Sequence, residues 1–151
     1  AKEFEQLMSD ESVDVIVWTA RGYPGAERRP EMYGWVQVAE DNLTIKSISV
    51  KKPLKNASVD PIVVGAFTFK RFSDFTESVA RMKSRSGKIN GEYYVDTAIN
   101  DAIALGKKCV VFDVDYYLCW GTPDDLDTYK YWESCFHKWD SHPFKKLQHN
   151  N

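Results

Sequence analysis

Three short runs of apolar, mostly β-branched residues constrain the fold of this chain more than any other feature. They are VDVIVW at positions 13–18, PIVVGAFTF at 61–69 and CVVFDV at 109–114. Apolar runs of this length without polar alternation are typical of strands that are covered on both faces of a sheet. We therefore expect a sheet with helices packed against both of its sides.

Segments with helical periodicity lie before, between and after these runs. Residues 2–9, 72–85 and 95–105 each carry an apolar stripe at helical spacing, and Gly106 ends the third of them. A further helix begins at Thr122, with Pro123 at its first position and acidic residues in its first turn. Strands alternating with helices predict a three-layer α/β fold with a mixed, mostly parallel sheet and helices on both faces.

The stretch between the first two apolar runs predicts an antiparallel insertion into this sheet. Residues 21–30 hold two glycines and two prolines, which indicates an irregular loop, and residues 33–42 and 43–53 form two strand patterns joined at 40–42. The apolar alternation slips between Ile45 and Ile48, which predicts a β-bulge. Gly65 lies within the next strand, where a glycine commonly marks the close approach of a ligand or another backbone.

Length and composition indicate one soluble globular domain, residues 1–151. The chain is 43% hydrophobic and 28% charged, and its formal net charge of −2 argues against a general binder of nucleic acid or of membrane surfaces. No apolar run has the length of a membrane span, and the charged first residues do not form a signal peptide. Three widely spaced cysteines do not indicate a disulfide framework, so we expect a cytoplasmic location.

Common catalytic motifs do not account for the chain. It contains no G-x-S-x-G, no P-loop and no G-x-G-x-x-G. A nucleophilic role for Cys119 has no neighbouring histidine to support it, and a small apolar filler is the more ordinary interpretation. What remains is a set of polar residues and glycines at strand ends and helix starts, which is where open α/β sheets bind ligands.

Five segments, taken in order, resemble the second half of the sugar-phosphate nucleotidyltransferase domain. They are YGWVQVAEDN, SISVKKP, VVGAFTF, GEYYVDTAINDAIALGKK and DVDYYLCWGTPDDL. The glucose-1-phosphate thymidylyl-, uridylyl- and cytidylyltransferases belong to this family, and the similarity extends over about residues 13–133. The resemblance implies part of a Rossmann-like nucleotide-diphospho-sugar transferase fold, namely the C-terminal, sugar-phosphate-binding portion of the domain.

The resemblance also implies a pocket for the sugar phosphate. Tyr33 and Gly34 would line it, with the glycine allowing backbone groups to approach the sugar hydroxyls. Lys52 matches the catalytic lysine that neutralises the phosphate of the sugar 1-phosphate, a task suited to a compact charge on a long stem. Gly65 and Glu92 would face the same pocket. Each residue alone has an ordinary structural interpretation, and the ordered set favours the pocket.

The reaction of the family joins a sugar 1-phosphate to a nucleoside triphosphate, releases pyrophosphate and depends on Mg²⁺ for charge neutralisation. The chain departs from the family at Lys51, which replaces an acidic residue, and at Cys119, which replaces a metal-binding aspartate. Because Mg²⁺ prefers carboxylate oxygens, the metal ligand is left unassigned, with Asp115 and Asp96 as candidates.

The glycine-rich phosphate loop of the family's first half is not found in the sequence. We therefore expect the chain to supply the sugar-phosphate side of a nucleotidyltransferase of nucleotide-sugar and polysaccharide biosynthesis, and to be inactive alone. The expected partners are a sugar 1-phosphate and a nucleoside triphosphate, with no nucleic acid and no membrane, and a homo-oligomer is left open. The alternative is a non-catalytic nucleotidyltransferase-like module for binding or assembly, which the changes at Lys51 and Cys119 and the aromatic helix after Thr122 favour.

Overall fold

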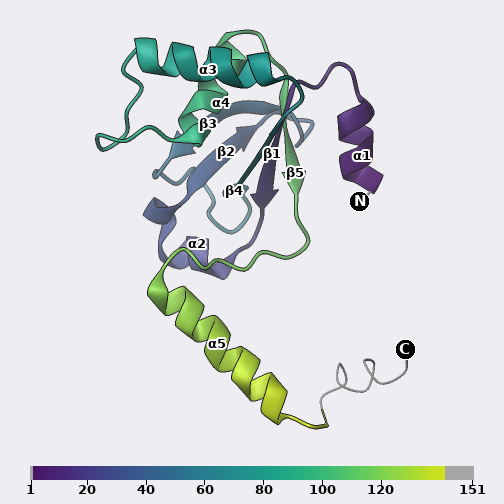
Figure 1. Ribbon diagram of the computed structural model, residues 1–151, viewed down its shortest axis with the longest axis vertical. Coiled ribbons are helices and arrows are strands. Elements are labelled where there is room, and N and C mark those ends of the chain that lie inside the picture. Colours follow the sequence, from purple (N-terminus) through teal and green to yellow (C-terminus); the bar gives the residue numbers. More distant parts are fainter. Residues whose placement is uncertain (1, 142–151) are drawn as a thin grey trace. The chain divides into compact units, whose positions relative to one another are not determined.

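The computed structural model describes residues 2–141 and divides the chain into two units, one ending at Tyr117 and one beginning at Leu118 (Figure 1). The elements of the first unit are α1 (Lys2–Ser9), β1 (Val15–Ala20), α2 (Pro24–Arg28), a 3-10 turn (Pro30–Met32), β2 (Gly34–Val38), β3 (Ile45–Val50), β4 (Ile62–Phe69), α3 (Phe72–Ser84), α4 (Val95–Ala104) and β5 (Cys109–Asp113). The second unit contains α5 (Pro123–Lys138).

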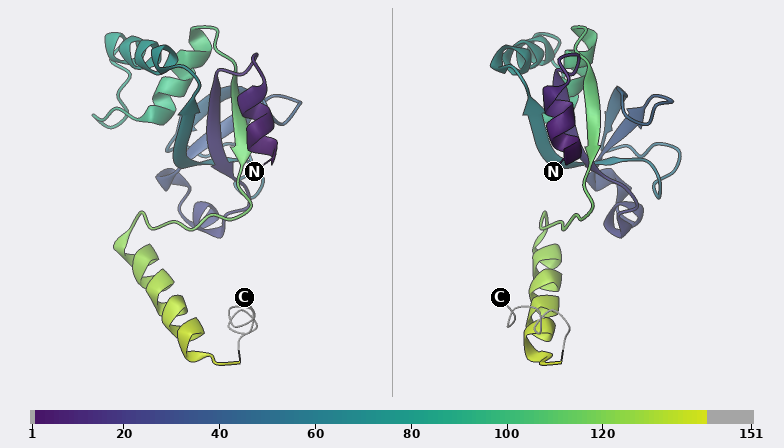
Figure 2. Two further views of the ribbon diagram at one scale, coloured as in Figure 1. Left: turned by 45° about the vertical axis from the view of Figure 1, so that its right-hand side comes forward. Right: turned by 90° about the vertical axis from the view of Figure 1, so that its right-hand side faces the viewer.

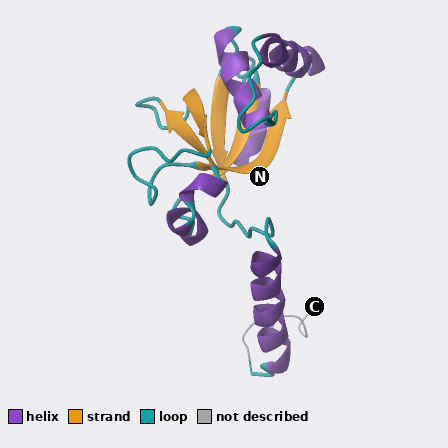
Figure 3. Ribbon diagram, turned by 90° about the vertical axis from the view of Figure 1, so that its left-hand side faces the viewer, coloured by secondary structure: helices purple, strands orange, loops and turns teal. Residues whose placement is uncertain are grey.

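The five strands form one mixed sheet in the order β3-β2-β4-β1-β5. The strands of this sheet are twisted (Figure 3). β1 and β5 pair in parallel, whereas the pairs β1–β4, β2–β4 and β2–β3 are antiparallel. The prediction of a mostly parallel sheet is therefore wrong. An apolar run identifies a strand covered on both faces but carries no information about its direction. The connections set the direction, and here β2, β3 and β4 follow one another through loops rather than through crossover helices.

Helices cover both faces of the sheet (Figure 2). On one face Ile99 and Ala102 of α4 pack with Val15 and Val17 of β1, and on the other face Leu7 of α1 packs against the alternate residues of the strands. Because side chains alternate along a strand, β1 contributes to both clusters. Burying each such Val, Leu or Ile side chain contributes about 1.5–3 kcal/mol, so this central strand anchors the unit.

The outer strands of the sheet are covered along part of their free edges. The backbone N–H of Val111 in β5 donates to the carbonyl of Leu43 at 2.9 Å. At the other edge the backbone N–H of Ile48 donates to Oδ1 of Asn100 at 2.7 Å, and Nδ2 of Asn100 donates to the carbonyl of Ile48 at 2.8 Å. These bonds occupy backbone groups that would otherwise be open to pairing with another chain, and they attach α4 to β3.

Several local predictions are confirmed. The pairing of β2 with β3 skips Lys46, so the expected bulge lies between Ile45 and Ile48. Gly106 adopts a φ of 80° just after α4, the left-handed conformation of a helix-ending glycine. In the second unit Oγ1 of Thr122 accepts the backbone N–H of Asp125 at 3.2 Å and donates to its carboxylate at 2.7 Å, which caps α5 as expected.

Two local predictions are wrong. The loop at 21–30 contains the short helix α2, because Pro24 is preset for the first position of a helix and glycine and proline counts alone do not report it. The buried line of α3 consists of Asp74, Ser78 and Met82, whereas Phe72, expected on the apolar stripe, is 79% exposed. Within residues 2–141 no helix has the length and hydropathy needed to cross a membrane.

Candidate functional site

One edge of the sheet gathers the strand ends that the sequence singles out. The register pairs Gly34 with Val50, Trp35 with Ile62, and Thr19 with Asp113. The starts of β2 and β4 and the ends of β1, β3 and β5 therefore lie along the same edge. This is the end of the sheet at which strands begin or finish, and not the free side of an outer strand. We call it the site edge and define it as residues 19–21, 33–34, 50–52, 61–62 and 113–114.

Gly34 packs against the first turn of α4. A Cβ atom at this position would lie 2.3 Å from Oδ2 of Asp96 and 3.3 Å from Cγ2 of Val63, and real Cβ atoms essentially never come within 3.0 Å of another atom. We expected the glycine to admit a sugar. The group that occupies the space of its missing side chain is the carboxylate of Asp96, so a side chain at position 34 would displace the end of that acid.

Asp96 is a half-buried carboxylate without a cation. Within residues 2–141 it forms no ion pair and no hydrogen bond to another side chain. Burial raises the pKa of Asp96 above its ordinary value, and only its own backbone N–H acts in the opposite direction. An acid with a raised pKa and no ionic partner in a ligand-binding part of a fold is a candidate functional group.

Lys51, Tyr94 and Glu92 form a connected group next to this acid. Nζ of Lys51 lies 5.0 Å from the centroid of the Tyr94 ring, and the Tyr94 hydroxyl donates a hydrogen bond to Glu92. A hydrogen bond to Tyr94, together with the charges of Tyr94 and Glu92, raises the pKa of Lys51. The backbone N–H of Lys51 also donates to the carbonyl of Tyr33 at 3.0 Å, so the group adjoins Gly34.

Three residues of this region, Lys51, Asn90 and Gly91, have left-handed backbone conformations. Lys51 has a φ of 58°, a left-handed conformation that is uncommon for residues other than glycine and that clusters at ligand sites. Asn90 and Gly91 have φ values of 50° and 84°, and the backbones of Ile89 and Glu92 exchange two hydrogen bonds across them. This is the Asn-Gly turn of a tight hairpin, and it positions Glu92 and Tyr94 just before α4.

No contact of their side-chain positions connects Lys52 and Gly65 to the other predicted site residues within residues 2–141. Lys52 directly follows Lys51, and its exposed side chain forms no hydrogen bond or ion pair with residues 2–141. Gly65 lies at a register shift of β4 and has a φ of 93°. No described atom comes within 4 Å of the position of its Cβ, so backbone conformation rather than close approach of another backbone requires this glycine.

Sequence reasoning missed a second polar group at the same edge. Oγ1 of the buried Thr19 donates to Asp113 at 2.6 Å, and Arg21 forms an ion pair with the other oxygen of that carboxylate at 2.7 Å. Arg21 also donates to the carbonyl of Val59 at 3.1 Å, which ties the loop after Lys52 to the end of β1. In the sequence, the signal that could have identified this group is the position of Asp113 at the end of an apolar strand, where open α/β sheets bind ligands.

The described residues do not form a magnesium site by themselves. No group of three or more His, Cys, Asp and Glu side chains within residues 2–141 is arranged to hold a metal ion. Asp115 is exposed and follows β5, whereas Asp96 packs against β2, and β4 and β1 lie between these strands in the sheet. Cys119 belongs to the second unit, where its sulfur accepts the N–H of Gly121 at 3.4 Å. A sulfur is a poor ligand for Mg²⁺, so we derive no reaction step through a metal.

Comparisons with known proteins bear on the fold. No protein-family model and no curated protein sequence matches the chain. Among solved structures, the chain is similar to the nucleoside-diphosphate-sugar pyrophosphorylase from Vibrio cholerae RC9, with a TM-score of 0.62 and 16% sequence identity over 78% of this chain. The match covers 46% of that protein, so the chain spans about half its length. At this identity the likeness shows a shared α/β fold.

Proposed function

We propose that this chain is the sugar-phosphate-binding portion of a nucleotidyltransferase that joins a sugar 1-phosphate to a nucleoside triphosphate and releases pyrophosphate. One observation carries the proposal. The segments around Tyr33–Gly34, Lys51–Lys52 and Glu92–Asp96 are far apart in the sequence, yet contacts connect them at one edge of the sheet. The fold in which they meet is shared with a pyrophosphorylase of sugar nucleotides.

The chemistry of these residues suits a phosphorylated carbohydrate. The ammonium of Lys52 has no protein partner among residues 2–141 and is available to a phosphate as a compact charge. The carboxylates nearby are suited to accept hydrogen bonds from sugar hydroxyls. In the complete reaction an oxygen of the sugar phosphate attacks the α-phosphorus of the triphosphate and pyrophosphate leaves. Such transfer depends on positioning and on neutralising charge, and this chain provides the positioning of the attacking phosphate.

The first test is binding of hexose 1-phosphates to the full chain, followed by the amide resonances in an NMR titration. We expect shifts at Gly34, Lys52 and Gly65, and no turnover when a nucleoside triphosphate is added to the chain alone. Lys52→Ala should weaken binding about tenfold, because a charge-assisted hydrogen bond is lost. Lys55→Ala, in the same exposed loop, is the matched control and should change little. Absence of shifts at the site edge, or equal losses in the two variants, would overturn the proposal.

A non-catalytic role in assembly is the second candidate, and α5 favours it. No residue of this helix is buried, and Tyr131 and Trp132 are 63% and 55% exposed. Light scattering over a range of concentrations tests this role. Self-association that Trp132→Glu abolishes, combined with no binding of hexose 1-phosphates, would favour the assembly module over the enzyme.

A cytoplasmic location, which the free state of all three cysteines supports, stays part of the proposal.

A further inference from the structure

The carboxylate of Asp96 is enclosed on one side and reachable on the other. Its Oδ2 occupies the space above the Cα of Gly34, next to the side chain of Val63. The residue is half-buried, and its oxygens are not among the fully buried polar atoms that lack a hydrogen-bond partner in the described part of the chain. The group is therefore held in one place by packing while part of it still faces solvent, which is the arrangement of a side chain that meets a ligand.

An ordinary role at a helix start does not explain Asp96. A carboxylate in the first turn of a helix is usually solvated or bonded to the cap, and Asp125 of α5 follows this pattern through its two hydrogen bonds with Thr122. Asp96 forms no comparable bond, and the cap of α4 is the backbone of Tyr94 without a side-chain hydrogen bond. The desolvation of Asp96 is thus unfavourable for the free chain, and within residues 2–141 only its own backbone N–H offsets part of it.

No neighbouring charge contributes to the shifted pKa of Asp96. Lys51, the cation at the adjoining end of β3, is engaged by the ring of Tyr94 and by the charge of Glu92. Neutral hydroxyl groups are suited to the vacant acceptor positions, because a carboxylate can accept hydrogen bonds from two neighbouring hydroxyls and such charge-assisted bonds are short and strong. A phosphate would be repelled by the carboxylate and attracted by Lys52. The two side chains therefore distinguish the two ends of a sugar phosphate.

Resting on the function proposed above, we propose that Asp96 is a specificity-determining residue that accepts hydrogen bonds from hydroxyl groups of the sugar ring. Gly34 is required because any larger residue displaces this carboxylate. The substrate class is accordingly a sugar phosphate with free hydroxyls at the end remote from the phosphate. Lys52 binds the phosphate end, and Asp96 sets the orientation of the ring.

The test compares ligands that separate the two ends of the substrate, in the presence of EDTA so that no metal contributes. Affinities of the full chain are measured for a hexose 1-phosphate, for its monodeoxy analogues and for inorganic phosphate. The unmodified chain should lose about tenfold in affinity for at least one monodeoxy analogue, because a charged acceptor is left without its donor. Asp96→Asn should bind the parent sugar phosphate about tenfold more weakly, bind inorganic phosphate unchanged, and no longer distinguish that analogue.

Four further variants and a control complete the design. Lys52→Ala should weaken both the sugar phosphate and inorganic phosphate, which sets it apart from Asp96→Asn. Gly34→Ala should reproduce the loss of Asp96→Asn, and Gly34→Ala combined with Asp96→Ala should bind no worse than Asp96→Ala alone, since both changes remove the same contact. Glu40→Gln is the control, because Glu40 is exposed and forms no hydrogen bond or ion pair with the described residues.

The outcomes separate this inference from the proposed function. If the unmodified chain binds the sugar phosphate and Asp96→Asn binds every ligand as tightly as the unmodified chain, Asp96 does not contact the sugar and the inference is wrong while the function stands. An equal loss for inorganic phosphate also contradicts it. If the unmodified chain binds no sugar phosphate, the function and the inference fail together. The monodeoxy series uses the unmodified chain and so does not depend on the folding of any variant.

Discussion

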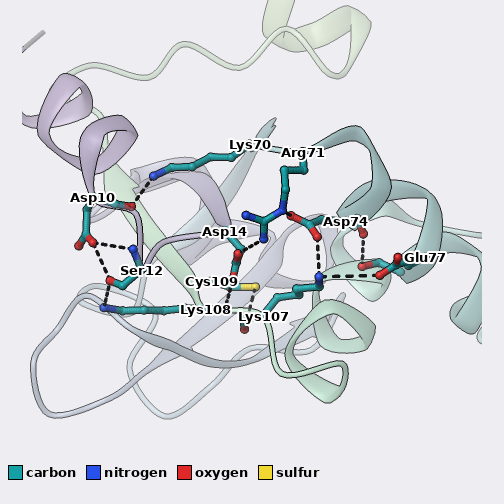
Figure 4. Close-up of polar contacts among 11 residues, drawn as sticks. Asp10, Ser12, Asp14, Lys70, Arg71, Asp74, Glu77, Lys107, Lys108 and Cys109 are labelled. Atoms are coloured by element: carbon teal, nitrogen blue, oxygen red, sulfur yellow. Dashed lines mark hydrogen bonds and ion pairs between the residues drawn. The ribbon is translucent and has the colours of Figure 1, made fainter.

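The two ends of the sheet carry the same kinds of charged side chain but use them in opposite ways. At the end away from the site edge, where β1 and β5 begin and β4 ends, acids and bases form a connected network (Figure 4). We call this network the paired end, and it includes Asp10, Ser12, Asp14, Lys70, Arg71, Asp74, Glu77, Lys107, Lys108 and Cys109. At the site edge Arg21 and Asp113 form an ion pair, but Lys52, and Asp96 packed against Gly34, have no ionic partner among residues 2–141.

The paired end compensates the burial of its acids. Asp74 is fully buried and forms ion pairs with Lys107 at 2.6 Å and with Arg71 at 3.0 Å. Burial acts to raise the pKa of Asp14, but the backbone N–H of Lys108 and the guanidinium of Arg71 outweigh it, so the pKa is lowered. Opposite pKa shifts of Asp14 and Asp96 follow from the presence of partners at one end and their absence at the other. The paired end thus neutralises its buried acids, whereas Asp96 and Lys52 next to Gly34 and Lys51 stay available to a ligand.

The largest effect is expected when the paired end is broken. Asp74→Ala removes the buried acid that Lys107 and Arg71 share, leaving Lys107 with Glu77 and Arg71 with Asp14, and we expect a loss of about 2 kcal/mol in the free energy of unfolding. Urea unfolding followed by circular dichroism measures it. Glu77→Ala is the control, because Glu77 is 57% exposed and lies 3.7 Å from the same lysine, and its effect should be small. Equal effects of the two substitutions would show that burial of the pair does not matter.

A smaller effect of the opposite sign is expected from Asp96→Asn at neutral pH. The pKa of Asp96 is raised in the folded state above the ordinary 3.8, so the folded chain binds more protons than the unfolded chain between these two values. Stability therefore falls as the pH rises through that window, and the cost is fully present above it. Asp96→Asn should make the chain more stable at pH 7, and the gain should disappear as the pH falls to 3.8.

Asp14→Asn should show the reverse dependence. The lowered pKa of Asp14 contributes stability that is present above 3.8 and is lost as the pH falls through the folded value. Its substitution should therefore destabilise the chain at neutral pH and matter less in acid. Urea midpoints of the two variants and the unmodified chain, measured from pH 3 to 8, provide the comparison. Parallel pH profiles for Asp96→Asn and Asp14→Asn would show that the two ends do not differ.

The smallest effect concerns the reactivity of cysteines and leaves stability unchanged. Burial raises the pKa of Cys109, which lies at the paired end, to about 12. Little thiolate is therefore present at pH 8, and iodoacetamide should modify Cys109 only after unfolding in urea. Cys119, which is half-exposed, is the internal comparison. Labelling followed by peptide mass spectrometry reads the order of modification, and early labelling of Cys109 would mean that the paired end opens readily.

The sequence predicted the elements of the fold better than their arrangement. Apolar runs located β1, β4 and β5, and the slip between Ile45 and Ile48 located a bulge, because these features depend on neighbouring residues. Strand direction depends on how the strands are connected in the folded chain, and the apolar runs did not predict it. At the site, Gly34 was found as a glycine but not as the neighbour of Asp96, since that contact joins β2 to a helix some 60 residues later along the chain. Lys51 was noted for its charge, whereas its left-handed backbone could not be anticipated.

The contact between Gly34 and Asp96 has a consequence for the history of the protein. The two positions share one small volume, so a side chain at position 34 competes with the carboxylate at 96. A lineage that acquires a side chain at position 34 is expected to shorten the residue at 96, and a lineage that keeps the acid is expected to keep the glycine. Covariation of these two columns among descendants of a common ancestor would thus record the shape of the site through time.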